Sequence, residues 1–125
     1  MHIVFRTDAS VQIGTGRVMR CLTMADALRD AGAKCTFICR SHTGNLMDLI
    51  HQRGHSIIAL ATKTVPPADK QEMLHHAAWL GSDWVSDASE TAQRLEPQCA
   101  DWLVVDHYAL DERWETALQI GRAHV

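Results

Sequence analysis

Short apolar runs alternate along this chain with longer stretches in which apolar residues recur at every third or fourth position. A short apolar run is typical of a strand that is buried on both faces of a parallel sheet. The three-and-four spacing is typical of a helix that packs one face against such a sheet. The runs predict four strands, at residues 3–8, 34–39, 56–60 and 102–106.

Two helices are predicted between the first three strands. The first ends at Ala31-Gly32 and the second stops at Gly54, since glycine commonly follows the last residue of a helix. Their apolar stripes follow the helical spacing and consist of Val18, Cys21, Leu22, Ala25 and Leu28 in the first helix and Leu46, Leu49 and Ile50 in the second.

The second half of the chain predicts two further helices around the last strand. Asp87, with a glutamate three residues later, has the pattern of a capping box, so a helix is expected to start there and to run through Leu95. Asp111 is expected to cap a last helix. Between residues 61 and 84 the pattern predicts only a loop at two adjacent prolines and a short helix around residues 73–77.

The alternation of strands and helices predicts an α/β fold with a doubly wound parallel sheet, because right-handed crossovers return each strand to the same sheet. A chain of 125 residues has room for one such domain. In these sheets, ligands bind beyond the carboxyl ends of the strands. Polar residues gather at two of these ends, from Asp8 to Arg20 after the first strand and from Asp106 to Tyr108 after the last.

Composition excludes several classes of function. The formal net charge of -3 at pH 7 leaves no excess of basic residues for a nucleic-acid partner. No apolar run reaches the roughly 20 residues of a membrane span, and the N-terminus lacks the basic and apolar regions of a signal peptide. We therefore expect a cytoplasmic protein with no membrane partner.

The four cysteines and eight histidines form no recognisable metal or disulfide motif. The cysteines lack a CxxC pair and are expected to be buried free thiols in a reducing compartment. The histidines include no HExxH motif, so we assign no metal and no cofactor. His42, His51 and His55 are expected at the surface, and the four tryptophans are expected in the core or at a domain interface.

A glycine loop between the first strand and the first helix is a candidate anion site. Gly14 and Gly16 permit a tight turn and close approach of a ligand to the backbone, and the start of the helix favours negative charge. Arg17 and Arg20 add positive charge there. The dinucleotide-binding fingerprint would need glycine or alanine where Met19 stands, and no Gly-Lys-Ser/Thr follows for a P-loop. A glycine turn without a ligand is the alternative.

The two polar segments together resemble one enzyme family. The matching residues are Phe5-Arg6-Thr7-Asp8-Ala9-Ser10, Ile13-Gly14-Thr15-Gly16, Val18-Met19-Arg20-Cys21-Leu22, Val105-Asp106-His107-Tyr108-Ala109-Leu110-Asp111 and Trp114-Glu115. In these positions, from residue 1 to about 119, the chain is similar to the UDP-2,4-diacetamido-2,4,6-trideoxy-beta-L-altropyranose hydrolases of pseudaminic acid biosynthesis.

The resemblance implies the N-terminal, Rossmann-like half of a two-domain GT-B-like fold. Residues 1–119 would form the sugar-side domain, and the C-terminal UDP-binding domain would be absent from this chain. The resemblance also implies hydrolysis of a UDP-linked diacetamido-trideoxy sugar by attack of water at the anomeric carbon, with release of UDP and without a metal. Tyr108 would line the sugar site.

Residue 17 departs from the family pattern, which has histidine there as the base that activates water. Arg17 stays protonated and offers only hydrogen-bond donors, so it cannot accept a proton, although it can hold a phosphate or a sugar hydroxyl. Four explanations are open. The protein is a hydrolase that has lost its base, or it uses His107 or Asp8 as the base instead. It belongs to a related branch that transfers a sugar rather than hydrolysing, or a single-base sequence error has replaced histidine with arginine. A glycosyltransferase-like protein and an inactive fragment or binding module are therefore alternatives. We expect this chain alone to be inactive.

Three acidic and imidazole side chains at the strand ends have both a functional and a structural interpretation. Asp8 would bind a sugar hydroxyl or orient a catalytic group, or it would only hydrogen-bond the turn. Asp106 and His107 would contribute to the substrate site together with Tyr108. Alternatively, Asp106 would bond the neighbouring loop while His107 points to water.

The last residues do not continue the helical pattern. Residues 120–125 match the translation of a common short-read sequencing adapter, so we expect a non-native tail, with native residues ending near Gln119. A natural terminus is the alternative.

Overall fold

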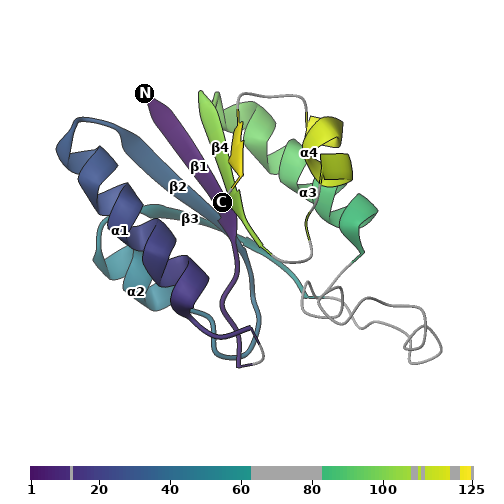
Figure 1. Ribbon diagram of the computed structural model, residues 1–125, viewed down its shortest axis with the longest axis horizontal. Helices are drawn as coiled ribbons and strands as arrows, with labels where there is room; N and C mark the ends of the chain where they lie inside the picture. The colour runs from purple at the N-terminus through teal and green to yellow at the C-terminus, as the bar shows by residue number, and fades with distance from the viewer. Residues whose placement is uncertain (12, 63–82, 108–109, 111, 119–121, 125) are drawn as a thin grey trace.

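Figure 1 shows the computed structural model of the chain, which describes residues 1–11, 13–62, 83–107, 110, 112–118 and 122–124. The strands are β1 (His2–Thr7), β2 (Lys34–Arg40), β3 (Ser56–Leu60), β4 (Trp102–Asp106) and β5 (Arg122–His124). The helices are α1 (Gly16–Asp30), α2 (Met47–Gln52), α3 (Trp84–Leu95), the 3-10 helix η3 (Glu96–Gln98) and α4 (Glu112–Leu118). The four strands predicted from the apolar runs are confirmed.

The strands form one sheet in the order β3-β2-β1-β4-β5, and every pairing is parallel. The predicted α/β class and parallel sheet are therefore confirmed. The chain builds outward from β1 to β3 and then crosses to the other side of β1, where β4 lies (Figure 1). The direction of strand addition thus changes between β1 and β4. In open α/β sheets, the crevice beyond the strand ends at such a point is where ligands bind.

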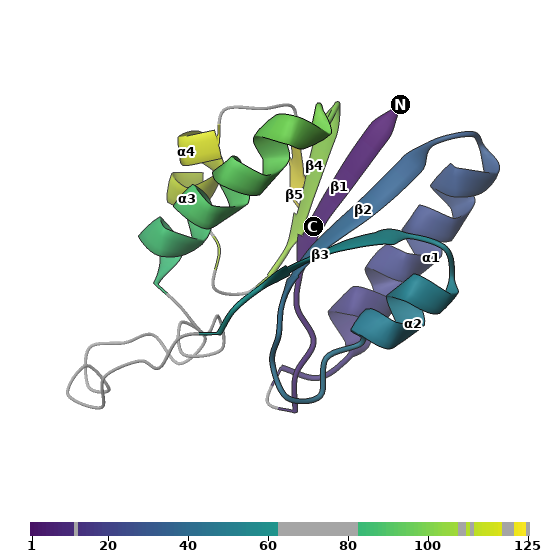
Figure 2. The ribbon, with the colours of Figure 1, turned by 180° about the vertical axis from the view of Figure 1, so that it is seen from behind.

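Helices cover both faces of the sheet (Figures 1 and 2). On one face, α1 and α2 enclose a core in which the rings of Phe5 and Phe37 stack with their centroids 4.8 Å apart. On the other face, α3 and α4 enclose a second core around Trp114, which is fully buried. The apolar stripe predicted for the first helix is confirmed, because Val18 and Leu22 are among its residues that face the first core.

The start of α3 differs from the prediction. The N-cap is Asp83, whose carboxylate accepts a hydrogen bond from the backbone amide of Ser86 at 2.7 Å. Asp87 lies one turn into the helix and is fully buried, so the prediction that it caps the helix is wrong. The capping pattern fails here because Asp87 faces Arg6 on the neighbouring strand, a contact that local spacing does not reveal.

Several predicted features fall outside the described residues. These are the loop at the two prolines, the short helix around residues 73–77, and the side chains of Trp79, Tyr108 and Asp111. The last helix itself is confirmed, since α4 begins at residue 112. Residues 122–124 pair with β4 as β5. That the tail is non-native stays a prediction, because backbone pairing does not depend on the origin of a segment.

Two of the predicted exposures are wrong. Cys21, Cys35 and Cys39 are buried free thiols as expected, but Cys99 is exposed beyond η3. His55 was expected at the surface, yet it is only 4% exposed, because its ring packs beside Phe37 and its Nε2 lies 2.8 Å from Asp26 Oδ1.

The described tryptophans lie in three environments. Trp114 is in the core, and Trp84 is partly buried with the Arg113 guanidinium 4.8 Å from its ring centroid. Trp102 is 45% exposed and therefore not in the core, and its place at a domain interface stays a prediction. Among the described helices, none is long and apolar enough to cross a membrane.

Candidate functional site

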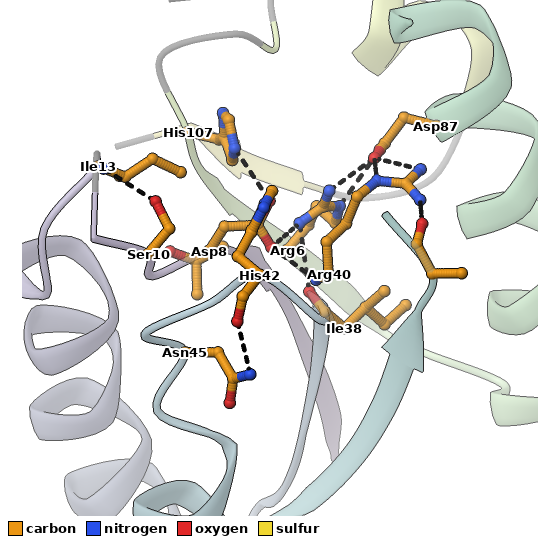
Figure 3. A network of polar contacts seen from close by, with 12 residues as sticks. Arg6, Asp8, Ser10, Ile13, Ile38, Arg40, His42, Asn45, Asp87 and His107 are labelled. Carbon is orange, nitrogen blue, oxygen red and sulfur yellow. Dashed lines mark hydrogen bonds and ion pairs between the residues drawn. The ribbon is translucent and has the colours of Figure 1, made fainter. Parts of the chain in front are cut away.

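The carboxyl ends of β1, β2 and β4 meet at one edge of the sheet. Because β1 lies between the other two strands, the residues that follow the three strands are neighbours there. The loop after β1 is joined to the loop after β2 by a backbone hydrogen bond from the Val11 amide to the Thr43 carbonyl, at 3.0 Å. Figure 3 shows those of the polar residues at this edge that surround Asp8.

The glycine loop forms a tight turn before α1. The Gly14 amide donates to the Ser10 carbonyl at 2.8 Å, and the Ser10 hydroxyl accepts from the Ile13 amide at 2.9 Å. Gly14 has a φ of 85°, which is in the left-handed region that favours glycine. Gly16 then begins α1, where an added side-chain atom would meet nothing within 4 Å. The loop therefore leaves open space at the start of the helix.

The start of α1 carries positive charge from its backbone. Thr15 occupies the N-cap without making a side-chain capping bond, and the first turn contains no acidic residue. The first amides of a helix have no partner within the helix, and the helix dipole adds partial positive charge at this end. An anion would be stabilised here.

Arg17, Arg20 and Asp106 form an ion cluster beside the start of α1. Arg20 holds the Asp106 carboxylate with two nitrogens, Nε at 3.0 Å from Oδ2 and Nη2 at 2.8 Å from Oδ1. Arg17 Nη1 donates to Oδ1 of the same carboxylate. Two guanidinium groups therefore share one carboxylate, and this trio has one more positive than negative charge. Asp106 is fully buried, and its carboxylate contacts both guanidinium groups.

Asp8 is the centre of a second group. Its Oδ1 accepts from Arg6 Nη1 at 2.7 Å and from the Arg40 backbone amide at 2.8 Å. Its Oδ2 lies 3.0 Å from His107 Nε2 and 3.3 Å from His42 Nε2. Asp8 is fully buried, so it reaches a ligand only through the imidazoles that it contacts.

The pKa of Asp8 decides the role of its carboxylate. Burial would raise this pKa, but the Arg6 charge and the hydrogen bonds from His107 and His42 outweigh burial and hold the pKa well below its usual value. Asp8 is therefore an anion at neutral pH and only accepts hydrogen bonds. Both imidazoles must present Nε2–H to it.

His107 does not point to water. It is 4% exposed and directed at Asp8, so the alternative in which it faces solvent is wrong. The reason is the pairing of β1 with β4, in which Thr7 lies opposite Asp106. The residue that follows each of these, Asp8 and His107, then meets the other beyond the strand ends.

A buried ion network lies behind Asp8 (Figure 3). Arg6 Nη2 lies 2.6 Å from Asp87 Oδ2, and Arg40 Nε donates to the same oxygen at 3.0 Å. Trp114 Nε1 donates to Asp87 Oδ1 at 2.8 Å. The network links β1 and β2 to α3 and α4, and it fixes the position of the Asp8 carboxylate through Arg6.

The two groups lie on opposite faces of the same sheet edge. Side chains alternate along a strand, so Asp106 shares the α1 face with Val104. Arg6 shares the α3 face with Val4 and reaches both Asp8 and Asp87 there. At the carboxyl ends of β1 and β4, a cationic group therefore lies on one face of the sheet and a carboxylate with two imidazoles lies on the other.

The structure thus brings together most of the predicted site residues. Gly14, Gly16, Arg17, Arg20 and Asp106 lie in one group, Asp8 and His107 lie in the other, and Tyr108 lies outside the described residues.

Sequence reasoning missed Arg6, Arg40 and His42. A signal for Arg6 was available, since an arginine inside a buried apolar run must find a charged partner. His42 gave no comparable signal, because its contact with Asp8 exists only when β1 and β2 are paired.

The nearby thiols are poor nucleophiles. Cys21 Sγ lies 3.9 Å from Asp106 Oδ2, and burial together with this negative charge raises the pKa of the thiol to about 12. Burial also raises the pKa of Cys39. A thiol must ionise to attack, so neither would react at neutral pH. Within the described ranges, no three His, Cys, Asp or Glu side chains are placed to hold a metal ion.

A cavity of about 300 Å³ lies elsewhere, between α3, η3 and α4. Its lining consists of Ala92, Leu95, Glu96, Cys99, Ala100 and Leu118. Since η3 precedes β4, this cavity is at the amino end of that strand, away from the polar groups described above.

The chain matches no protein-family model, and no curated protein shows significant sequence similarity to it. The functional interpretation therefore depends on the motifs of the sequence and on the arrangement of these side chains.

Proposed function

We propose that this chain is the sugar-side domain of a UDP-sugar hydrolase with a GT-B-like two-domain fold, acting on a UDP-linked diacetamido-trideoxy sugar. One observation carries the proposal. The two segments on which the resemblance rests follow β1 and β4, the neighbouring strands between which the order of strand addition reverses. Direct contacts join the two segments, Asp8 to His107 and Arg20 to Asp106.

In the proposed reaction, water attacks the anomeric carbon. A bond forms between the water oxygen and that carbon, while the bond from the carbon to the phosphate oxygen breaks and its electron pair leaves with UDP. Negative charge grows on the phosphate as the bond breaks. Preorganised positive groups stabilise such developing charge. Arg17, Arg20 and the start of α1 supply them, with Asp106 holding the arginines in place.

The attacking water must lose a proton, and Arg17 cannot take it. Among the described residues at this edge, the imidazoles of His42 and His107, both in contact with Asp8, are the candidates to take it. Tyr108 follows His107 in the chain, and the resemblance assigns it to the sugar site. In this proposal the second domain binds most of the UDP.

The test is an assay of UDP release. We expect the 125-residue chain to release no UDP from the diacetamido-trideoxy sugar nucleotide, and the same chain joined to its second domain to release it without any sugar acceptor. Release that requires an added acceptor would indicate glycosyl transfer instead. Absence of release from the two-domain protein under both conditions would refute the proposal.

A further inference from the structure

The proposed hydrolysis lacks an assigned base, because arginine occupies position 17. His42 is placed to supply one. It follows β2 in the loop that is joined to the glycine loop by the bond between Val11 and Thr43. Its Nε2 lies 3.3 Å from Asp8 Oδ2, the oxygen that His107 also contacts (Figure 3).

The contact with Asp8 fixes the tautomer of His42. An ionised carboxylate only accepts hydrogen bonds, so Nε2 of His42 carries the hydrogen. In a neutral imidazole the other nitrogen, Nδ1, then holds a lone pair. Among the described residues, no hydrogen-bond partner of this Nδ1 is found.

Exposure distinguishes the two imidazoles. The His42 side chain is 11% exposed, whereas that of His107 is 2% exposed. A base must reach the water that it deprotonates, directly or through one other water. His42 is therefore the imidazole of this pair that presents a surface to solvent.

We propose that His42 is the general base of this site, oriented by Asp8 through Nε2 and accepting at Nδ1 a proton of the attacking water. This assignment rests on the proposed hydrolysis. The water oxygen bonds to the anomeric carbon, UDP leaves with the electron pair of the broken bond, and the proton on Nδ1 passes to solvent before the next turnover. Asp8 is a positioning residue and keeps its charge throughout.

The charges around His42 come from every element packed at this edge. Arg6 lies on β1 and Asp8 follows that strand, Arg40 lies on β2, His107 lies beyond β4, and Asp87 lies behind them on α3.

The first test uses the 125-residue chain and does not depend on activity. Long-range proton–nitrogen NMR correlations of the histidine rings reveal which nitrogen carries the hydrogen. We expect the Nε2–H tautomer for His42 in the neutral form. An Nδ1–H tautomer would overturn the proposal, because the lone pair would then face Asp8.

The second test uses the two-domain protein. We expect His42→Gln to lower kcat by about 10²- to 10⁴-fold, the usual contribution of a general base, with little change in KM. His51→Gln is the matched control, since His51 is an exposed histidine of α2, and it should keep the wild-type rate. Added imidazole should restore part of the rate to His42→Ala, which a merely structural role of His42 would not allow.

The outcomes separate the two proposals. If the wild-type protein releases UDP and folded His42→Gln retains its rate, the role of His42 is refuted while the hydrolase stands. A gain of rate in Arg17→His, with no loss in His42→Gln, would show that the base has been lost from position 17. If the wild-type protein releases no UDP, the hydrolase proposal fails and the role of His42 fails with it.

Discussion

Arg6 and Arg40 lie with their side chains fully buried, in an environment that arginine enters only with partners. Asp87 is the partner that they share. Its Oδ2 contacts Arg6 at 2.6 Å and Arg40 at 2.8 Å, and its Oδ1 accepts from Trp114 and from Thr91. Asp87 thus supplies negative charge and acceptor positions to both buried cations, while Arg6 also pairs with Asp8 and Arg40 with Glu90.

Replacing Asp87 with alanine should be strongly destabilising. The change removes the carboxylate that both buried arginines contact, Arg6 and Arg40. Loss of one partner from a buried ion pair costs about 3–5 kcal/mol. We expect a loss of this size in the free energy of unfolding, measured by urea denaturation followed by circular dichroism.

The matched control is Asp30→Ala, because the Asp30 side chain is 78% exposed at the end of α1. That variant should stay within about 0.5 kcal/mol of the wild type. Equal losses in the two variants would contradict the central role given to Asp87.

At the scale of the element, the N-cap of α3 is Asp83, whereas the capping pattern of the sequence predicted Asp87. Asp83 has an extended backbone, with φ -85° and ψ 159°, and its carboxylate accepts from both the amide and the hydroxyl of Ser86. This arrangement satisfies one of the free amides at the start of the helix. Asp87, one turn later, is then available for Arg6.

Loss of the cap should have a moderate cost. Asp83→Ala removes the acceptor for the Ser86 amide, and loss of an N-cap typically costs about 1 kcal/mol. We expect a decrease of that size in the free energy of unfolding. Ser89→Ala, at an exposed position of the same helix, should leave stability nearly unchanged. Unchanged stability of Asp83→Ala would show that another group caps α3.

At the scale of the whole molecule, the pairing of β1 with β4, where the order of strand addition reverses, decides which side chains become neighbours. Asp8 and His107 are 99 positions apart in the sequence and meet beyond the ends of these two strands. Arg6 and Asp87 are 81 positions apart and join the sheet to α3. The stability of the fold and the geometry of the proposed site therefore depend on the same buried charges.

The folded protein should lose stability in acid. In the folded state the pKa of Asp8 is well below its usual value, and the pKa of Asp87 is also lowered. Burial is the largest single influence and would raise both. The charge of Arg6 outweighs burial only together with the hydrogen bonds from His107 and His42 for Asp8, and together with Arg40 and the hydrogen bond from Trp114 for Asp87. A carboxyl with a lowered folded pKa stabilises the fold fully above its unfolded pKa, near 4, and this contribution is lost as the pH falls through the folded pKa.

We therefore expect the free energy of unfolding to be smaller at pH 3 than at pH 5, as measured by urea denaturation. Between pH 5 and pH 7, the ionisation of Asp8 and Asp87 should not change the free energy of unfolding, because both carboxyls are ionised in the folded and in the unfolded state. Asp87→Asn should decline less steeply below pH 4, because it lacks one of the two titrating carboxyls. Constant stability from pH 5 to pH 3 would contradict this account.

The local pattern of apolar and polar residues predicted most of the strands and helices, but it did not predict the contacts of single polar residues. The runs at residues 102–106 and 56–60 predicted β4 and β3 with their observed bounds. For β4 the reason is burial on both faces, which requires apolar residues at successive positions. Asp87 and His55 were both assigned wrongly, one as a cap and one as a surface residue. In each case, the partner lies on another element, Arg6 on β1 for Asp87 and Asp26 on α1 for His55.

The sequence by itself determined the alternation of strands and helices, the glycine turn at Gly14 and the polar residues at the strand ends. These features follow from periodicity and backbone geometry, which act over a few neighbouring residues. Only the tertiary structure decided that Asp106 holds two arginines and that Asp8 holds two imidazoles. Such contacts depend on strand order and register, which arise when distant segments pair, and no local spacing encodes them.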